Sequence, residues 1–330
     1  MKFKLLLYCL FLNYISIAQP NKVFTVIHCD PDFAYLFSRL EQMVDSADAH
    51  SVPLTIELSP AWVDTILGNP IKLNKVRQWQ IDGHEIAAHH HGIYHCFWDL
   101  HTNYPQDSIN ANQGLGGGMG AGCNQILTPI NNMQPFWDNL DDVAGDSLML
   151  TWGSSDDYPA VDLKPYTPYR TDGGRDTVTQ GFSDPYTMIH GPTSVGGNSY
   201  GEFMTCQIDH YFIDTITDIG EMISEYNVSS KSVMGAVTHV FDFDENVTMG
   251  GPNYFYAWLN FVDTKDCRTV RNILRSEPVC GDAGIQEFNS STKELIGVFD
   301  VMGRATEYKP NTLLIYIYSD GTTEKVFSVE

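Results

Sequence analysis

The N-terminal part of the chain alternates between two hydrophobic periods. Short runs of β-branched and aromatic residues are typical of buried strands, and each run is followed by a stretch whose apolar residues recur at helical spacing. The pattern predicts strands at residues 23–28, 53–58 and 84–88 and helices at residues 33–50, 61–67 and 73–81. Regular alternation of strand and helix is typical of a parallel sheet covered by helices.

The pattern is less regular after residue 100. A glycine-rich stretch within residues 103–122 lacks the phosphate-loop signature, so it is interpreted as a lid or a substrate-side insertion. Residues 156–201 are rich in Tyr, Pro, Gly and Asp and are predicted to form loops. Their aromatic side chains could floor a polar cleft or pack a long loop; they include Tyr158, Tyr166, Tyr169 and Tyr186. Further elements are predicted as strands at 148–152 and 233–239 and helices at 212–226 and 253–274.

The two ends of the chain differ from its middle. Residues 1–18 carry lysines, then an apolar run, then small residues, which is typical of a secretory signal peptide. No later apolar run is long enough to predict an integral membrane segment after signal cleavage. From about residue 285 the sequence predicts three alternating strands. The expected organisation is a signal peptide at 1–18, a catalytic α/β domain at 19–280 and a small all-β module at 285–330.

Charge and cysteine usage limit the partners and the covalent links. The net charge is −22, and it becomes about −24 when the two lysines of residues 1–18 are removed. Such acidity argues against nucleic acid and anionic membranes as partners, but not against neutral sugars. Six cysteines remain in the mature chain. Cys267 and Cys280 form the expected disulfide because both lie near the predicted domain boundary, and the other pairings stay open.

Histidines crowd into one short stretch, residues 82–98. Five of the chain's 11 histidines lie there: His84, His89, His90, His91 and His95. Crowded imidazoles repel one another when protonated, whereas neutral imidazole is a common ligand of zinc and similar ions. Asp30 follows the first predicted strand, and sites in parallel sheets form where the carboxyl ends of strands meet. The sequence therefore predicts a divalent metal site, with a merely polar loop as the alternative.

The candidate ligands come from the end of the first predicted strand and from the histidine cluster. Asp30 is the carboxylate ligand, and two imidazoles complete a three-residue set with an open position. His89 with His95 and His91 with His95 are equally good pairs. In an extended segment His90 points to the opposite face from its neighbours, so it is predicted to face solvent or to support the site from outside.

The groups that would move protons are predicted from neighbouring segments. His239, at a strand end with aspartates close by, is the candidate general acid, a structural histidine being the alternative. Asp32 is the candidate base if its loop bends back. His28 and Asp99 are predicted to hold ligands through hydrogen bonds, although His28 could equally be a buried strand-end histidine. A nucleophilic Cys29 is disfavoured because it leaves the histidine cluster unexplained.

Residues 23 to about 275 resemble the polysaccharide deacetylase (NodB-homology) family of carbohydrate esterases. The matching segments are VIHCDPD, GHEIAAHHHGIYH and VTHVF. The resemblance implies a distorted (β/α) barrel, a metal ion and removal of N- or O-acetyl groups from a glycan. The family has two adjacent aspartates, a base and a metal ligand; here Cys29 stands in the first place and Asp30 in the second. The family's metal histidines are four residues apart, as His91 and His95 are, whereas the count from GHEI leads to His89.

A second resemblance covers about residues 285–330. VFDVMGR followed by KPNTLLIYIYSDGTTEK is similar to the C-terminal sorting module of the type IX secretion system in Bacteroidetes-type bacteria. It implies the secretion machinery as a partner and export to the cell surface or medium. An ordinary β accessory module is the alternative.

Three functional hypotheses follow. The first is an exported metal-dependent deacetylase of glycans, with zinc as the expected ion. The second is a metal-dependent amidase acting on a small C–N substrate, and the third is a non-catalytic glycan-binding protein on an esterase scaffold. The missing first aspartate favours the second and third hypotheses, whereas the histidines together with Asp30 favour an active metal site.

Overall fold

The computed structural model describes residues in both predicted domains. The described residues are 20–92, 98–107, 132–145, 151–154, 162–164, 167–173, 189–195, 203–213, 219–229, 231–243, 252–278, 280, 295–300, 304, 306, 312–318 and 323–327. The chain divides into two compact units, Met1–Gly284 and Ile285–Glu330.

Among the described residues of the first unit, seven parallel strands close into a barrel. The strands follow one another in the order β5, β4, β3, β2, β1, β8, β7, and β7 pairs with β5 to complete the ring. This confirms the expected (β/α) barrel. The barrel strands are β1 (Lys22–Cys29), β2 (Leu54–Leu58), β3 (Glu85–His90), β4 (Thr151–Ser154), β5 (Tyr169–Gly173), β7 (Phe203–Phe212) and β8 (Val233–His239), and β6 (Ile189–Val195) adds an antiparallel strand to β7.

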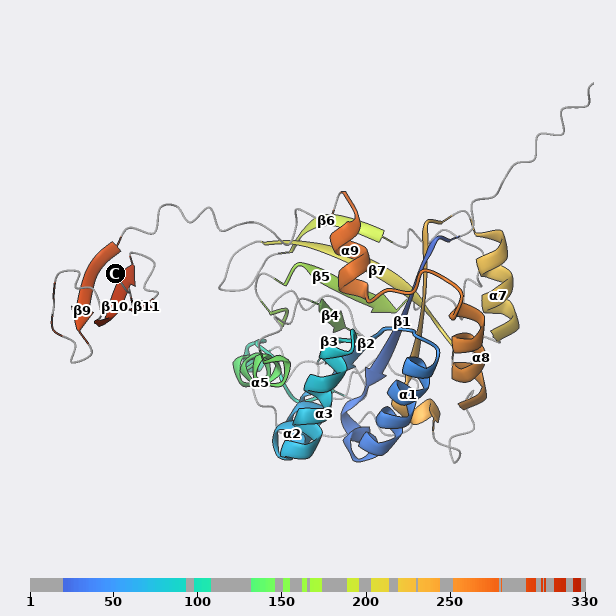
Figure 1. Cartoon of the computed structure of the whole chain (residues 1–330), viewed down its shortest axis with the longest axis horizontal. Helices are drawn as coiled ribbons and strands as arrows, with labels where there is room; N and C mark the ends of the chain where they lie inside the picture. The colour runs from blue at the N-terminus through green and yellow to red at the C-terminus, as the bar shows by residue number, and fades with distance from the viewer. Residues whose placement is uncertain are drawn as a thin grey trace, which may run out of the picture. The chain divides into compact units, whose positions relative to one another are not determined.

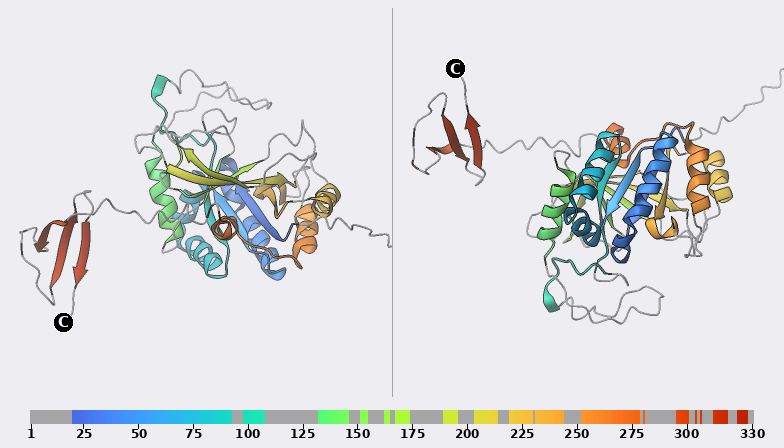
Figure 2. Two further views of the ribbon diagram at one scale, coloured as in Figure 1. Left: turned by 90° about the horizontal axis from the view of Figure 1, so that it is seen from above. Right: turned by 60° about the horizontal axis from the view of Figure 1, so that its bottom comes forward.

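Helices lie around the strands (Figure 1), and the turned views of Figure 2 show the same arrangement. Helix α3 begins three residues before the predicted start because Asn69 caps it, accepting hydrogen bonds from the N–H groups of Ile71 and Lys72. The described helices are α1 (Phe37–Ala49), α2 (Pro60–Leu67), α3 (Pro70–Ile81), α5 (Gln134–Ala144), α7 (Ile219–Val228), α8 (Pro252–Val262) and α9 (Val270–Ser276), with 3-10 turns η1 (Pro31–Leu36) and η2 (Val240–Phe243).

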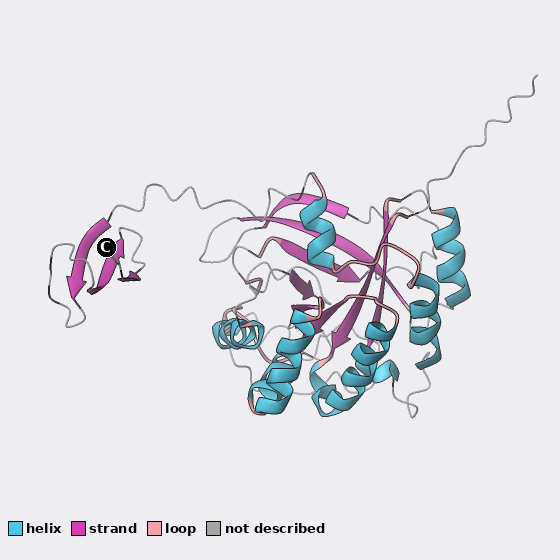
Figure 3. Cartoon of the chain, viewed as in Figure 1, coloured by secondary structure: helices cyan, strands magenta, loops and turns pink. Residues whose placement is uncertain are grey.

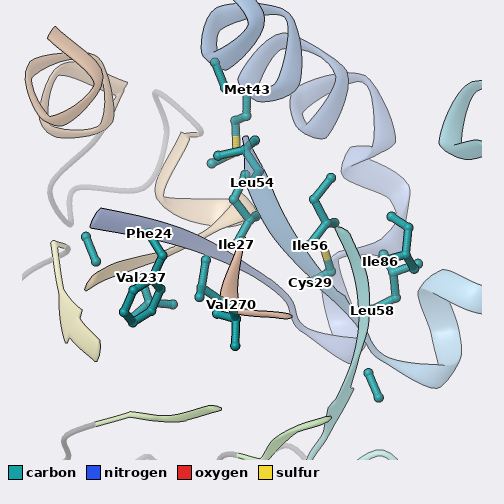
Figure 4. Close-up of a cluster of buried hydrophobic side chains, with 14 of the residues drawn as sticks. Phe24, Ile27, Cys29, Met43, Leu54, Ile56, Leu58, Ile86, Val237 and Val270 are labelled. Atoms are coloured by element: carbon teal, nitrogen blue, oxygen red, sulfur yellow. The ribbon is translucent and has the colours of Figure 1, made fainter. Parts of the chain in front are cut away.

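Strand alternation divides the barrel residues between two environments. On β2, Leu54, Ile56 and Leu58 point outward and pack under the helices, so the intervening Glu57 points inward. Figure 4 shows Cys29 in the same outer layer, near Ile56 and Leu58. The outer layer is therefore the hydrophobic core, and the interior of the barrel receives the polar side chains.

The amino-terminal end of the barrel is closed by α9. The N–H of Val270 donates to Thr55 Oγ1 at 2.9 Å, and the N–H of Arg271 donates to the Glu85 carboxylate at 2.9 Å. Buried acceptors thus satisfy N–H groups that the first turn of a helix leaves without partners. The carboxyl ends of the strands, where sites form in such barrels, lie at the opposite end.

The disulfide differs from the predicted one. Cys280 is bonded to Cys206 on β7, with a Cα–Cα distance of 5.9 Å, and Cys267 is a free thiol. The barrel brings Cys206 to the segment after α9, across 74 positions of sequence. Cys267 instead forms a backbone bridge with Val23, and its Sγ–H donates to the carbonyl of Val262. The prediction of a Cys267–Cys280 disulfide, which was based on nearness in the sequence, is therefore wrong.

Several other predicted elements differ from the structure. Residues 156–201, predicted as loops, contain β5 and β6, and Tyr169 is buried in β5 rather than on a cleft floor. The helix predicted from residue 212 begins at residue 219, because β7 continues to Phe212. The helix predicted over 253–274 is two helices, α8 and α9, separated by the backbone bridge of Cys267. Tyr158, Tyr166 and Tyr186 lie outside the described residues.

The second unit contains a three-stranded antiparallel sheet among its described residues. Its strands are β9 (Leu295–Asp300), β10 (Leu313–Tyr318) and β11 (Thr323–Phe327), with β10 in the middle. Figure 3 colours all three segments as strands. The prediction of three strands is confirmed. In the described part of the chain, no helix has the length and apolar composition needed to cross a membrane.

Candidate metal centre

Polar side chains from neighbouring strands meet inside the barrel at one level. His28 on β1 is in register with Glu57 on β2 and with His239 on β8. Partners in parallel strands point to the same side of the sheet, so these three side chains share the barrel interior. Asp30 comes two residues after His28 and returns to the same face, as do His89 on β3 and His91 directly after that strand.

Three potential ligand atoms converge at the carboxyl ends of β1 and β3. Asp30 Oδ1 lies 3.1 Å from His89 Nε2 and 3.6 Å from His91 Nε2, and the two ring nitrogens are 2.8 Å apart. All three side chains are buried. In a tetrahedral zinc site with bonds of 2.0–2.1 Å, ligand atoms are about 3.3 Å apart. One carboxylate and two imidazoles at these separations fit a divalent ion.

Glu57, which the sequence analysis did not select, lies directly below this set. Its Oε2 is 3.2 Å from His28 Nε2 and 3.5 Å from His89 Nδ1, and its Oε1 accepts a hydrogen bond from Thr171. The carboxylate also requires Gly153, because a Cβ at that position would overlap it. A single charged residue within the buried strand PLTIEL was the available signal in the sequence.

Mutual interactions set the charges in this cluster. Burial lowers the pKa of His28 well below its usual value, and the neighbouring His89 lowers it further. Burial alone would raise the pKa of Glu57, but the adjacent imidazoles of His28 and His89 outweigh it and hold this pKa far below its ordinary value. For Asp30 the same burial is outweighed by His239, His89 and His91, so its pKa is also well below normal. Both carboxylates are therefore anionic at neutral pH.

His239 lies at the mouth of the same cluster. Its Nδ1 is 3.0 Å from Asp242 Oδ2, which also accepts the His239 backbone N–H at 3.0 Å. Its ring stacks on Phe241, with centroids 4.6 Å apart, and is 5.3 Å from the ring of His28. A ligand-type atom of His239 lies within 4.8 Å of such atoms of His28 and Asp30. The structure thus brings together the predicted acid and the predicted carboxylate ligand.

Other predicted site residues are placed differently. Asp32 is exposed on η1, and none of the contacts among the described residues joins it to the histidines. Cys29 faces the outer core, where burial, followed by the charges of Asp30 and Glu57, raises the pKa of its thiol well above normal. That thiol is therefore poorly suited to act as a nucleophile. His95 lies outside the described residues.

His90 is not exposed to solvent, which corrects one of its two predicted placements. It is fully buried on the outer face of β3, with Nδ1 2.8 Å from Asp99 Oδ2 and Nε2 3.3 Å from Asp162 Oδ2. Burial alone would lower its pKa, but the two aspartates outweigh burial and raise the pKa of His90 to about 10. Asp99 Oδ2 also accepts the backbone N–H of His91 at 3.1 Å. The structure therefore connects Asp99 to a candidate ligand, through the backbone.

Two further histidines have other surroundings. His84 accepts the N–H of Leu54 at its Nδ1 and donates from Nε2 to Asp48, so it fastens β3 to β2 and α1, away from the cluster. His210 on β7 was not selected from the sequence; its ring centroid is 5.3 Å from that of His28. Burial lowers the pKa of His210 to about 4, so this imidazole is neutral at neutral pH.

Comparison with known proteins gives distant likenesses only. The sequence matches no protein-family profile, and no curated protein is significantly similar to it. Among solved structures, a provisionally assigned polysaccharide deacetylase from Mycobacterium smegmatis is 12% identical, with a TM-score of 0.41, covering 76% of this chain and 87% of that one. A 4-alpha-glucanotransferase from Thermococcus litoralis is 10% identical, with a TM-score of 0.42, covering 76% of this chain and 37% of that one. Both likenesses are too distant to identify a function.

Proposed function

We propose that the protein is a metal-dependent hydrolase that removes N- or O-acetyl groups from a glycan. The observation that carries the proposal is the convergence of Asp30, His89 and His91, whose ligand-type atoms lie 2.8–3.6 Å apart where strands of a closed barrel end. The resemblance of the segments around these residues to polysaccharide deacetylases supports the same reaction.

Asp30, His89 and His91 would hold the ion, for which zinc is the leading choice, and His95 stays a further candidate ligand. When bound, such an ion polarises the scissile carbonyl and lowers the pKa of a water molecule toward neutrality. Two neutral imidazoles and one carboxylate leave a dipositive ion with net positive charge. That charge suits an ion that stabilises developing negative charge on oxygen.

His239 is the proposed proton donor to the leaving group. Asp242 engages its Nδ1, which leaves Nε2 to hold the proton that is transferred. The stacked Phe241 ring fixes the plane of the imidazole. Asp32 remains the proposed base; because it is exposed on η1, that role requires η1 to move toward the histidines. Cys29 stands in the place where the resembled family has its base, and its side chain points to the outer core.

The direction of Cys29 also favours a second candidate reaction. A site without the usual adjacent carboxylate suits a metal-dependent amidase acting on a small C–N substrate. The experiment is to load the protein with zinc and assay N-acetylated oligosaccharides, O-acetylated oligosaccharides and small amides side by side. Activity on small amides alone would select the second candidate. A protein that binds zinc and glycan but turns over none of these substrates would be a non-catalytic glycan-binding protein.

The role of His239 is tested with two substrates. His239→Ala should lower turnover of an N-acetyl oligosaccharide by roughly 10²–10⁴-fold while leaving the zinc content unchanged. The deficit should shrink with an aryl acetate, whose leaving group needs little protonation. His50→Ala, at the end of α1, is the matched control and should behave as the wild type. Loss of zinc in His239→Ala would make His239 a ligand instead of an acid.

Export is proposed separately from catalysis. Residues 1–18 are the proposed signal peptide, and residues 285–330 the proposed type IX sorting module, which together would place the protein at the cell surface or in the medium. A chain ending at Gly284 should keep its zinc and its melting temperature but should not be exported by a host that has this secretion system. Normal export of that shortened chain would refute the sorting role.

A further inference from the structure

The most unusual group in the barrel is the carboxylate of Glu57. Its side chain has no exposed surface, and Glu57 is the one charged residue of the strand that carries it. A buried carboxylate costs several kcal/mol unless neighbouring groups compensate for its lost hydration. None of the described contacts pairs Glu57 with a lysine or an arginine. Its compensation comes from Thr171 and from the rings of His28 and His89.

The neighbours of Glu57 are arranged around the charged group. Oε1 accepts the Thr171 hydroxyl, and Oε2 lies between the two imidazoles, 3.2 Å from His28 Nε2 and 3.5 Å from His89 Nδ1. The two rings lie against each other with centroids 4.2 Å apart. Gly153 on β4 supplies the space, since any Cβ there would overlap the carboxylate. Side chains from β1, β3 and β5 and a glycine from β4 thus accommodate one residue of β2.

The position of Glu57 matters because His89 has two distinct ring nitrogens. Nε2 faces the other candidate ligands, Asp30 Oδ1 and His91 Nε2. Nδ1 faces Glu57, and among the described residues it has no hydrogen-bond partner closer than this 3.5 Å ion-pair distance. A ring that gives a lone pair to a metal ion from Nε2 must carry its proton on Nδ1. A proton at that position is stabilised by the anionic oxygen opposite it.

Resting on the proposed metal-dependent function, we propose that Glu57 is a positioning residue that holds His89 with its proton on Nδ1 and its Nε2 directed at the ion. Glu57 acts through His89 and does not touch the substrate. It supplies from β2 a second carboxylate for the site, whereas the residue beside Asp30 in sequence, Cys29, faces the opposite side of β1. Partners of this kind typically contribute 10- to 100-fold in metal affinity.

Glu85 provides a matched control within the same barrel. It is also a buried inward carboxylate, 1% exposed, but it lies at the other end of the barrel and contacts Thr55, Thr151 and the N–H of Arg271 instead of histidines. Glu57→Gln and Glu85→Gln each replace a buried carboxyl group by an amide at comparable depth. Both should lower the melting temperature, and only Glu57→Gln should affect the ion.

The experiment measures zinc affinity of the full mature chain by competition with a chromophoric chelator. Glu57→Gln should bind zinc about 10- to 100-fold more weakly than the wild type, and Glu85→Gln should stay within about twofold of it. Thr171→Val, a milder change that removes the hydrogen bond to Oε1, should weaken zinc binding by a smaller factor and covers the case in which Glu57→Gln does not fold. Equal losses in Glu57→Gln and Glu85→Gln would reduce Glu57 to a general structural role and overturn the proposal.

A second readout examines the ring itself. Nitrogen NMR of the zinc-loaded protein, with His89 assigned by His89→Gln, should show the proton of His89 on Nδ1 and the metal on Nε2. The reverse assignment would overturn the proposal. So would a stoichiometry of two zinc ions per chain that falls to one in Glu57→Gln, because Glu57 would then be a metal ligand. A zinc affinity that depends on Glu57 in a protein without hydrolytic activity would refute the proposed function and leave this inference standing. A wild-type chain that binds no zinc would refute both.

Discussion

Three consecutive histidines of one segment lie in two chemically different clusters. His89 and His91 point into the barrel, where their Nε2 atoms are 2.8 Å apart and face one shared oxygen of Asp30. His90 points outward, where each of its ring nitrogens faces a carboxylate of its own, Asp99 or Asp162. The inner nitrogens converge on a common point, and the outer ones diverge.

The difference shows that the arrangement of partners, and not the residue type, decides what an imidazole does. At His90 the two carboxylates outweigh burial and raise the pKa to about 10, so this ring keeps both protons and offers no lone pair. His89 also has a carboxylate near each nitrogen, Asp30 and Glu57. It differs from His90 because its Nε2 and His91 Nε2 face the same oxygen of Asp30, so three ligand-type atoms converge where a metal ion could bind. The outer ion cluster is therefore structural, and the inner cluster is the candidate for chemistry.

The largest expected effect is the loss of the outer imidazole. His90→Ala would leave Asp99 and Asp162 as buried carboxylates without their shared cation, so it should cost about 3–5 kcal/mol of unfolding free energy. Urea denaturation of wild type and variant measures this. His50→Ala, which loses only a partly exposed ion pair 3.9 Å long, is the control and should change stability by less than about 0.5 kcal/mol. A change in unfolding free energy as small as that of His50→Ala would mean that the outer cluster does not stabilise the fold.

The inner cluster should respond in the opposite way. His91→Ala should weaken zinc binding by at least about 100-fold, more than the loss of a supporting partner would, while the metal-free protein melts near the wild-type temperature. Chelator competition and calorimetry on the same samples measure the two quantities. If His91→Ala lowered stability and spared zinc binding, the assignments of the two clusters would have to be exchanged.

The pH dependence of stability should sharpen the contrast. Because the folded pKa of His90 is about 10 and the ordinary value is 6.5, the folded state retains a proton that the unfolded chain releases between these values. The stabilisation from His90 is therefore complete below about pH 6.5 and is lost as the pH rises toward 10, by at most about 1.4 kcal/mol per pH unit. Denaturation curves from pH 6.5 to 10 should show this decline, and His90→Gln should flatten it. An unchanged slope in that variant would assign the decline to other groups.

The smallest expected effect comes from the edge of the outer cluster. The Thr102 hydroxyl donates to Asp162 Oδ2 at 2.8 Å, so Thr102→Val should cost about 1 kcal/mol while leaving zinc affinity unchanged. Measured together, the two values test how separate the clusters are. A fall in zinc affinity would show that strain passes through Asp99, which contacts both His90 and the backbone of His91.

The sequence by itself determined the alternation of the barrel and the segments from which the candidate site is built. Apolar runs fixed β1, β2 and β8 within about a residue, because a buried strand must be apolar on its outer face. Since β1 and β3 both end at the same edge of the barrel, Asp30 and the histidines were predicted to meet. Alternation along an extended segment also predicted that His90 points to the opposite face from His89 and His91.

Only the tertiary structure decided which distant groups face these residues. The lone glutamate of PLTIEL was a local signal, but only barrel closure placed Thr171 of β5 and Gly153 of β4 around Glu57 and so marked it as a site residue. Asp162 reaches His90 across 72 positions, and Cys206 reaches Cys280 across 74. Local periodicity records which face of a strand is buried, but the identity of a partner depends on chain closure over long separations. That closure is set by the packing of the whole barrel and not by any one segment.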